Sequence, residues 1–336
     1  MFLTCRVDTK KVGEFIQLMG LCILGAFFFN CSNVISQTYP TRPIRLIVPY
    51  SPGGATDILA RMVASKISID LGQQVIVENR SGAGSVIGTQ AVANAENDGY
   101  TLGFFDIAFA TNPSLLRDRL PYDSLRDFIP ISLVAIAPLV MVVHPSIPAR
   151  NVAEFIMYSK NNPSKINYSS GGVGSGIHLA GEQFKFVTGT DILHVSYKGA
   201  GPGISAILSG EVQLTYATPN SIISHVKSGR VIPLAILADN RINSLPDVPT
   251  VTEVGLQRLS ASPFFGVFAP ARTSENILSI LGRTFARYSS DPEVQRQLRL
   301  QGFEPLGQSR EAFGDFLRQE IQRWDGVVTR ANIKAD

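Results

Sequence analysis

The sequence predicts an α/β protein in two successive halves, each a mainly parallel sheet flanked by helices. Three observations support this prediction. Short runs rich in β-branched residues alternate with amphipathic stretches, which is typical of strand–helix–strand units. Glycine-rich loops follow several of the predicted strands, and the same order of elements begins again near Pro138.

The first half contains the clearest unit. A strand is predicted at 44–48 and a turn at 49–54, after which apolar residues recur at helical spacing until Gly72. Further strands begin at Val75 and at Thr101. Successive strands therefore deliver their loops to one edge of a sheet, and ligands bind at that edge in open α/β folds.

The second half repeats this order. Residues 139–143 form a predicted strand, and Asn151 with Glu154 has the spacing of a capping box at a helix start. A glycine-rich turn at 171–176 precedes a helix that ends at Gly189. The other strands of this half are predicted at 166–170, 192–197, 212–216 and 231–237.

The C-terminal part consists of one strand and three helices. The strand is predicted at 264–268, and helices follow at 274–289, at 292–301 and from Arg310 onward. The last helix carries an apolar stripe at helical spacing, so we expect Trp324, the only tryptophan, to pack in the core.

The composition limits the class of protein. With 336 residues and 45% hydrophobic residues, the chain can bury two cores. It holds 30 Lys and Arg against 27 Asp and Glu, so it lacks the basic excess of proteins that bind nucleic acid. We expect no nucleic-acid partner.

Residues 1–37 predict a secretory signal peptide. Three basic residues precede an uncharged apolar run at 17–29, which is short for a membrane span. We expect cleavage near Thr38 and export to the bacterial periplasm. A lipoprotein anchored through Cys31 and an uncleaved membrane anchor are the alternatives.

All three cysteines, Cys5, Cys22 and Cys31, lie inside the predicted signal peptide. The exported chain is therefore expected to have no disulfide and no thiolate nucleophile or metal ligand, so its stability depends on core burial. The signal peptide also removes three basic and two acidic residues, which leaves the exported chain nearly neutral.

The sequence lacks common enzyme motifs. Neither Ser85 nor Ser175 has a glycine two positions before it, so neither lies in a nucleophile elbow. The glycine spacings fit no dinucleotide fingerprint, and no Walker-type Gly-Lys-Ser/Thr occurs. His178 and Glu182 share a helix face, but no third metal ligand follows at a recognisable spacing. We expect no cofactor and no metal.

Loops rich in glycine and small hydroxyl residues are the strongest functional signal. They lie between predicted strands and helices at 52–57, 82–85, 171–176 and 198–203. Glycine lets the backbone approach a ligand closely, and the helix start behind it offers unpaired N–H groups and a positive dipole end. These features are typical of seats for anions.

Three polar side chains near these loops each have two interpretations. His178 could donate to a bound carboxylate or satisfy a loop carbonyl. Lys198 could reach the ligand or be a solvated loop residue. Asp57 is expected to complement its helix dipole rather than to contact the ligand.

Ordered motifs carry a family resemblance. They are Tyr39-Pro40-Thr41-Arg42-Pro43, Pro52-Gly53-Gly54 with Asp57, Val77-Glu78-Asn79-Arg80, Asp98-Gly99-Tyr100-Thr101-Leu102, Gly172-Val173-Gly174-Ser175, Tyr197-Lys198-Gly199 and Leu245-Pro246-Asp247-Val248-Pro249-Thr250. In type and order they resemble the Bug receptors, the periplasmic solute-binding proteins of tripartite tricarboxylate transport systems. The resemblance covers nearly all of the chain after residue 37.

The resemblance implies a two-domain clamshell of the periplasmic-binding-protein type, similar to type II, with two hinge strand crossings. It implies one domain at 38–137 plus 263–336 and a second at 138–262, with 139–144 and 264–268 as the crossings. It also implies a carboxylated ligand held largely by backbone N–H groups and ordered waters.

The loops and the resemblance together imply a set of ligand-binding residues. These are Ser51, Gly53, Gly54, Thr56, Gly84, Ser85, Phe105, Asp106, Gly174, Ser175, His178, Lys198 and Thr218. The expected ligand is a small organic acid, amino acid or aromatic acid. A membrane permease, or in some relatives a sensor, is the expected partner of a monomeric receptor.

The chain departs from the family after the third predicted strand. Where relatives carry small residues it has Phe104, Phe105 and Asp106, which favour a smaller ligand or one with an amine or an aromatic ring. Two other functions are open alternatives: an exported hydrolase or isomerase that uses His178 with Asp106 or Glu182, and an envelope protein of the same fold that binds no ligand.

Overall fold

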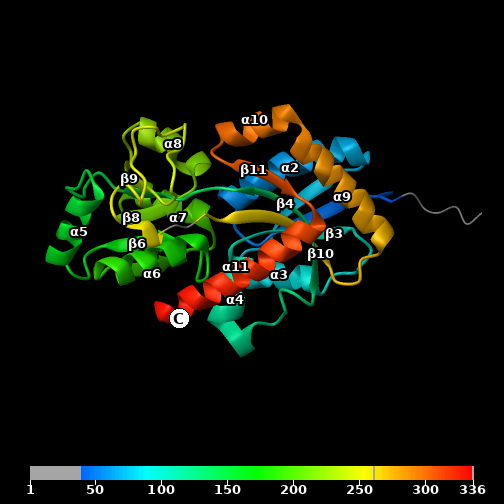
Figure 1. Cartoon of the computed structure of the whole chain (residues 1–336), viewed down its shortest axis with the longest axis horizontal. Coiled ribbons are helices and arrows are strands. Elements are labelled where there is room, and N and C mark those ends of the chain that lie inside the picture. Colours follow the sequence, from blue (N-terminus) through cyan, green and yellow to red (C-terminus); the bar gives the residue numbers. More distant parts are fainter. Residues whose placement is uncertain (1–38, 260–261, 335–336) are drawn as a thin grey trace, which may run out of the picture. The chain divides into compact units, whose positions relative to one another are not determined.

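Two β-sheets organise the chain. The computed structural model describes residues 39–259 and 262–334 (Figure 1), so the predicted signal peptide and its three cysteines lie outside the described residues. The first sheet has six strands in the order β11-β4-β10-β3-β1-β2, and the second has five in the order β7-β6-β8-β5-β9. The predicted α/β class is confirmed.

The first sheet combines early and late segments of the chain. Its strands are β1 (Ile44–Val48), β2 (Val75–Asn79), β3 (Thr101–Asp106), β4 (Phe128–Ile136), β10 (Phe264–Pro270) and β11 (Glu304–Gln308). β1 pairs in parallel with β2 and β3. β10 lies antiparallel to β3 and β4, and β11 lies antiparallel to β4.

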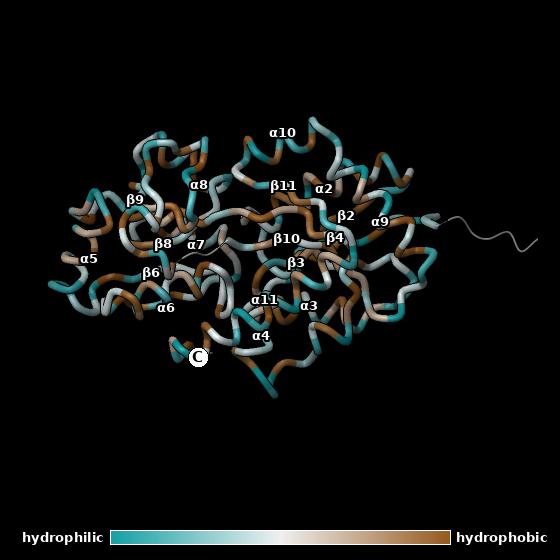
Figure 2. Tube along the Cα trace, in the orientation of Figure 1, coloured by the Kyte–Doolittle hydropathy of each residue, from teal (hydrophilic) through white to brown (hydrophobic). Residues whose placement is uncertain are grey.

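Helices cover both faces of this sheet. They are α2 (Ala55–Leu71), α3 (Val86–Ala93), α4 (Ala108–Leu116), α9 (Glu275–Ser290), α10 (Pro292–Leu300) and α11 (Arg310–Arg330), with a short 3-10 helix η1 (Arg117–Arg119). α2, α9 and α10 pack on one face, and α3, α4 and α11 on the other. In Figure 2 the tube of α10 alternates between hydrophobic and hydrophilic residues, as expected for a helix with one buried face.

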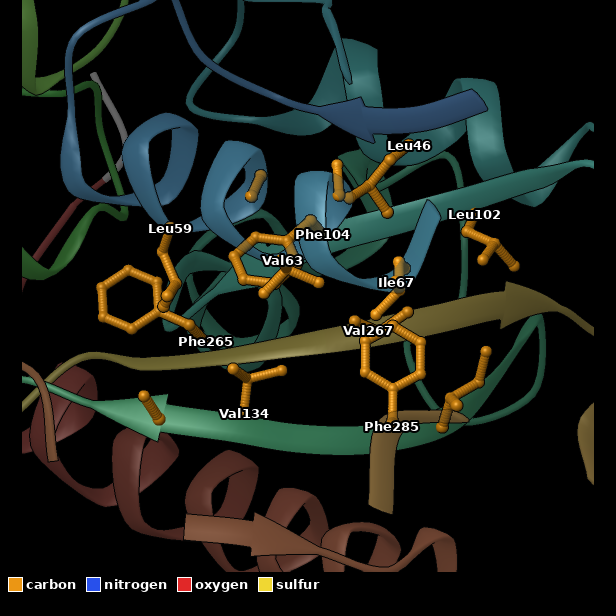
Figure 3. Close-up of a cluster of buried hydrophobic side chains, with 14 of the residues drawn as sticks. Leu46, Leu59, Val63, Ile67, Leu102, Phe104, Val134, Phe265, Val267 and Phe285 are labelled. Atoms are coloured by element: carbon orange, nitrogen blue, oxygen red, sulfur yellow. The ribbon is translucent and has the colours of Figure 1, made fainter. Parts of the chain in front are cut away.

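The core under α2 explains where this helix lies. Leu59 and Val63 lie on one side of α2, and Phe265 and Val267 of β10 belong to the same cluster of buried side chains (Figure 3). Burying one large aliphatic side chain is worth about 1.5–3 kcal/mol, so this stripe holds the helix against the sheet. The helix ends where Gly72 adopts a φ of 64°, which glycine reaches without a steric penalty.

The second sheet is also enclosed by helices. Its strands are β5 (Val140–Val143), β6 (Asn167–Ser170), β7 (Leu193–Ser196), β8 (Leu214–Ala217) and β9 (Ile232–Ile236). Its helices are α5 (Val152–Asn161), α6 (Gly176–Thr188), α7 (Ala200–Ser209), α8 (Pro219–Lys227) and the 3-10 helix η2 (Gln257–Leu259). α5 and α6 contribute to the core on one face, and α7 and α8 to the core on the other.

Two local predictions are confirmed. The Oδ1 atom of Asn151 accepts a hydrogen bond from the Glu154 N–H at 2.9 Å, and the Glu154 side chain accepts one from the Arg150 N–H at 2.6 Å. These contacts form the predicted helix start of α5. Trp324 is fully buried, and its indole N–H donates to Glu320 at 3.0 Å.

The prediction that each sheet is mainly parallel is wrong in detail, because both sheets are mixed. β5 lies antiparallel to β8 and β9, while β6 pairs in parallel with β7 and β8. The physical reason lies in the connections. A chain that leaves the first sheet along β4 and returns along β10 must run in opposite directions in the two strands, which makes them antiparallel neighbours.

The chain passes between the sheets twice. The first crossing is the short link at 137–139, and the second lies between β9 and β10. The two meet where the Ala137 N–H donates to the Pro263 carbonyl at 3.0 Å. The expected crossing segments at 139–144 and 264–268 therefore lie beside these points, mostly inside the second and the first sheet respectively.

Elements without a counterpart in the sequence prediction include α4, β4 and β11 of the first sheet and its helices, and α8 of the second. Across residues 39–259 and 262–334, no helix combines the length and the apolar character needed to cross a membrane.

Candidate functional site

A central cavity lies among loops that come from both sheets. Its lining from the first sheet consists of Tyr50, Gly54, Ala55, Thr56, Asp57, Asp106 and Phe265. Its lining from the second sheet and the crossings consists of Leu139, Gly171, Ser175, Gly176, Ile177, Ala200, Thr218 and Pro263. Most of these residues follow the carboxyl ends of β1, β3, β6, β7 and β8, where the sequence predicted the ligand loops.

Four helices begin at the central cavity. α2 starts at Ala55, α7 at Ala200, α6 behind the N-cap Ser175 and α8 behind the N-cap Thr218. The first N–H groups of a helix lack partners inside the helix, and the helix dipole places a partial positive charge at this end. The cavity therefore presents four positive helix ends to one small volume.

Three of these four helix ends are left available by their caps, whereas the Ser175 side chain caps α6 by accepting the His178 N–H. The N-cap residues of α2, α7 and α8 are Gly54, Gly199 and Thr218, and none of the three makes a side-chain capping bond. Among the described residues that line the cavity, none is Lys, Arg or His. A bound anion would thus be neutralised by backbone N–H groups rather than by basic side chains.

Asp57 is an internally compensated carboxylate in the lining. It accepts hydrogen bonds from the Gly53 N–H at 3.1 Å and from Asn79 at 2.9 Å, and it forms an ion pair with Arg61 at 2.9 Å. Burial alone would raise the pKa of Asp57, but the bonds from Arg61, Asn79 and Gly53 outweigh this effect and lower the pKa. Asp57 lies in the first turn of α2, as its predicted role requires, and it also lines the cavity.

Asp106 is the second carboxylate in the lining and lies in different surroundings. It accepts hydrogen bonds from the Tyr50 hydroxyl at 2.8 Å, the Ala108 N–H at 3.1 Å and the Thr56 hydroxyl at 3.2 Å. Burial raises the pKa of Asp106 above its usual value, although these three bonds act in the opposite direction. Burial and the neighbouring Asp106 also raise the pKa of Tyr50.

A side cavity adjoins the central one and shares Tyr50 and Gly171 with it. Its other lining residues are Gly82, Ala83, Gly84, Ser85, Val86, Leu116, Arg119, Gly172, Val173, Ser196, Tyr197 and Lys198. The central cavity measures about 40 Å³ and the side cavity about 380 Å³. Since one water needs about 10–15 Å³ on this measure, the central cavity admits a few waters or a compact polar group.

Loops of the two sheets touch, and α4 of the first sheet also contacts a loop of the second. The Ser51 N–H donates to the Lys198 carbonyl at 2.9 Å, and the Thr111 hydroxyl donates to the Gly174 carbonyl at 2.7 Å. A Cβ atom built on Gly172 would lie 3.0 Å from the Cα atom of Gly84. Glycine therefore lets the two loops approach more closely than any other residue would.

The structure brings eleven of the thirteen predicted ligand-binding residues to this region. Gly54, Thr56, Asp106, Ser175 and Thr218 line the central cavity, while Gly84, Ser85 and Lys198 line the side cavity. The rest of the eleven are Ser51 and Gly174, which make the backbone contacts between loops, and Gly53, which lies next to them and lines a neighbouring hollow.

The structure does not place Phe105 at the cavity. The side chain is 1% exposed and packs between Phe109 and Phe268, with ring centroids 5.2 and 5.3 Å away. Successive side chains of a strand point to opposite faces, so Phe104 and Phe105 enter the two separate cores of the first sheet. Only Asp106, at the end of β3, reaches the cavity.

His178 also points away from the cavity lining. It is 2% exposed, its Nδ1 atom accepts the Gly174 N–H at 3.3 Å, and its ring lies 4.4 Å from that of His194. Burial lowers the pKa of His178 from 6.5 to about 3, so the ring is neutral. It thus holds the glycine loop in place, as an acceptor rather than as the donor expected from the sequence.

Several lining residues were not predicted from the sequence. Leu139, Ile177, Phe265 and Pro263 form apolar walls, and Tyr50 carries the hydroxyl that reaches Asp106. Tyr50 had a signal in the sequence, because it directly follows the strand that leads into the first glycine-rich loop. The apolar residues had none, since a wall residue and a core residue share the same hydrophobic pattern.

Two enclosed sheets, with a cavity lined by helix N-termini between their loops, are typical of a solute-binding receptor. Residues 59–333 match the model of the tripartite tricarboxylate transporter family receptor (TctC). Protein BugT of Bordetella pertussis is 36% identical over 319 residues, which is 94% of this chain and 98% of BugT. The chain belongs to the tripartite tricarboxylate transporter receptor family.

Solved structures agree with this assignment. The periplasmic binding protein BugD is 31% identical, with a TM-score of 0.85, and the match covers 88% of this chain and 99% of BugD. Rpa4515 of R. palustris, solved with adipate, is 33% identical with a TM-score of 0.85, and the match covers 88% of this chain and 99% of that protein. The predicted family resemblance and fold are confirmed.

Proposed function

We propose that this protein is a periplasmic receptor that captures a small carboxylated solute in the central cavity and delivers it to the permease of a tripartite tricarboxylate transporter. The observation that carries the proposal is the meeting of four helix N-termini in a lining without basic side chains. The adipate complex of Rpa4515 supports a carboxylate as the ligand class.

The strength of such a seat follows from the helix ends. A negative group at a helix N-terminus gains about 0.3–1 kcal/mol at an exposed site and up to about 2 kcal/mol in a partly buried one. Four ends around one carboxylate can therefore supply several kcal/mol, enough for selective capture. Thr56, Ser175 and Thr218 add hydroxyl groups in the lining that can orient the acid.

We further propose that the two sheets are the cores of two domains, 38–137 plus 263–336 and 138–262, that move about the crossings. Contacts to the ligand from both domains exist together only when the loops meet, so binding shifts the population toward the closed arrangement. The direct contacts between Ser51 and Lys198 and between Thr111 and Gly174 support this mode of closure.

Location and partner belong to the same proposal. Residues 1–37 act as a signal peptide, with a lipid-anchored form through Cys31 as the alternative, and the mature chain works in the periplasm without catalysing a reaction. It is a monomer that presents its closed form to permease subunits or, as the alternative, to a sensor.

A thermal-shift screen of the exported protein tests the proposal. The panel holds dicarboxylates, tricarboxylates, aromatic acids and amino acids, and each hit is repeated with its methyl ester as the matched control. A ligand at a hundred times its Kd stabilises the folded state by about 2.7 kcal/mol, which raises the Tm by several degrees. The proposal fails if no acid raises the Tm, or if the esters raise it equally.

A further inference from the structure

The two carboxylates of the central cavity differ in whether a neighbouring cation neutralises their charge. Asp57 has the guanidinium of Arg61 within 2.9 Å. Among the ion pairs formed by the described residues, none includes Asp106, although its side chain lines the same cavity. Asp106 therefore faces the cavity without an ion-pair partner among the described residues.

The hydrogen bonds of Asp106 leave capacity for a ligand. An ionised carboxylate offers about four acceptor positions. Three neutral donors occupy it: Tyr50 and Ala108 bond to Oδ1, and Thr56 bonds to Oδ2 at 3.2 Å, which is long for a hydroxyl donor. The Oδ2 atom thus has one weak partner and room for a strong one.

A buried carboxylate is costly unless a cation accompanies it. In this cavity a ligand can supply the missing cation, because the lining residues themselves include no Lys, Arg or His. An ammonium group suits the position, since N⁺–H···O⁻ bonds are short and roughly twice as strong as neutral ones. The carboxylate of the same ligand belongs at the helix N-termini.

We propose that Asp106 binds an ammonium group, and that the solute of this receptor is a small amino acid rather than a simple organic acid. This inference rests on the proposed function, because it takes the helix ends as the carboxylate seat. The apolar walls of Leu139, Ile177 and Phe265 would contact the side chain of the amino acid. The small central cavity favours a compact ligand.

Matched ligand pairs test the inference by isothermal titration calorimetry on the exported protein at pH 7.5. Each pair differs only in the amino group: L-alanine and propionate, L-leucine and 4-methylpentanoate, L-aspartate and succinate, L-glutamate and glutarate. We expect the wild type to bind the amino member of at least one pair tenfold or more tightly than its partner.

The variant Asp106→Asn keeps the size of the side chain and removes its charge. We expect it to lose at least tenfold in affinity for the amino member and to lose the preference between the pair. The matched control is Asp291→Asn, which removes a carboxylate at the N-cap of α10, outside the cavity lining. Its affinity and its preference for the amino member should persist, because Asp291 does not line the cavity.

The outcomes separate the inference from the proposed function. If the wild type binds the organic acid as tightly as the amino acid or more tightly, the inference is wrong and the carboxylate receptor stands. If neither member of any pair binds, both are wrong. The selectivity of the wild type needs no variant, so the test holds even if Asp106→Asn does not fold.

Discussion

The substitution Gly84→Ala tests whether closure depends on contact between the glycine loops. Gly84 has a φ of 58°, and a Cβ atom built on it would fall well inside 3.0 Å of the Val173 carbonyl oxygen, on the loop after β6. That oxygen is part of the backbone, so it cannot turn away as a flexible side chain would. The two loops must move apart to admit the methyl group.

The magnitude follows from what the separation breaks. The neighbouring hydrogen bonds between the two sheets and their helices run from Ser51 to Lys198 and from Thr111 of α4 to Gly174. Each such bond contributes about 0.5–1.5 kcal/mol net, so losing both costs the closed state about 1–3 kcal/mol. We expect the affinity for the tightest ligand of the screen to fall about 5- to 150-fold.

The control is Gly189→Ala, at the end of α6. Gly189 has a φ of 65°, and a Cβ atom there meets nothing within 4 Å. Both variants place alanine in the left-handed region at about 1–2 kcal/mol, so this part of the fall in the unliganded Tm should be common to both. Calorimetry should then show weaker binding for Gly84→Ala only. Equal affinity of both variants, at wild-type level, would refute the dependence of closure on this glycine.

Two further predictions concern the stability of the fold: one compares a glycine of α6 with a glycine of α9, and the other concerns the buried His178. Gly181→Ala should lower the free energy of unfolding by about 1–3 kcal/mol, because its Cβ atom would overlap the ring of buried Tyr168. Gly282→Ala, which has open space, should instead raise it by about 0.5–1 kcal/mol; urea titration measures both. Because burial lowers the pKa of His178 to about 3, the unfolded chain alone binds this proton as the pH falls below about 6.5. Stability should thus drop by about 1.4 kcal/mol per pH unit between about pH 6 and 4, and His178→Gln should remove that slope.

Two outcomes of these experiments would contradict the predictions. Equal destabilisation by Gly181→Ala and Gly282→Ala would mean that contact with Tyr168 is not the cause. Parallel stability curves of the wild type and His178→Gln from pH 6 to 4 would mean that His178 does not resist protonation in the folded state.

The sequence was informative wherever local order decides the structure. Each glycine-rich loop was predicted at the right place because a strand, a tight turn and a helix start must follow one another in an α/β unit. β4 was missed, although its residues 128–136 are largely apolar, because Pro130 breaks the pattern of a central strand. The structure accommodates Pro130 where the register of β4 and β10 shifts, opposite Phe268.

The site was harder to predict from the sequence, because the direction of each side chain decides which residues line it. Phe105 and Asp106 are neighbours in sequence, yet one packs in an aromatic core and the other faces the cavity. His178 was expected near the ligand because of its place in the first turn of α6, but the rotation of the helix turns it inward. Hydrophobic pattern fixes a face only after the partner sheet is known, and that partner comes from distant segments.

The four helix ends of the central cavity bear on how such a receptor can change its ligand specificity during evolution. Every residue except proline carries the same backbone N–H group, so the groups that hold the acid carry no side-chain specificity of their own. New ligand specificities arise through side chains that bind or exclude the rest of the solute. Position 106 is one such place. A single substitution there, in a duplicated gene, can change which solute the same fold binds.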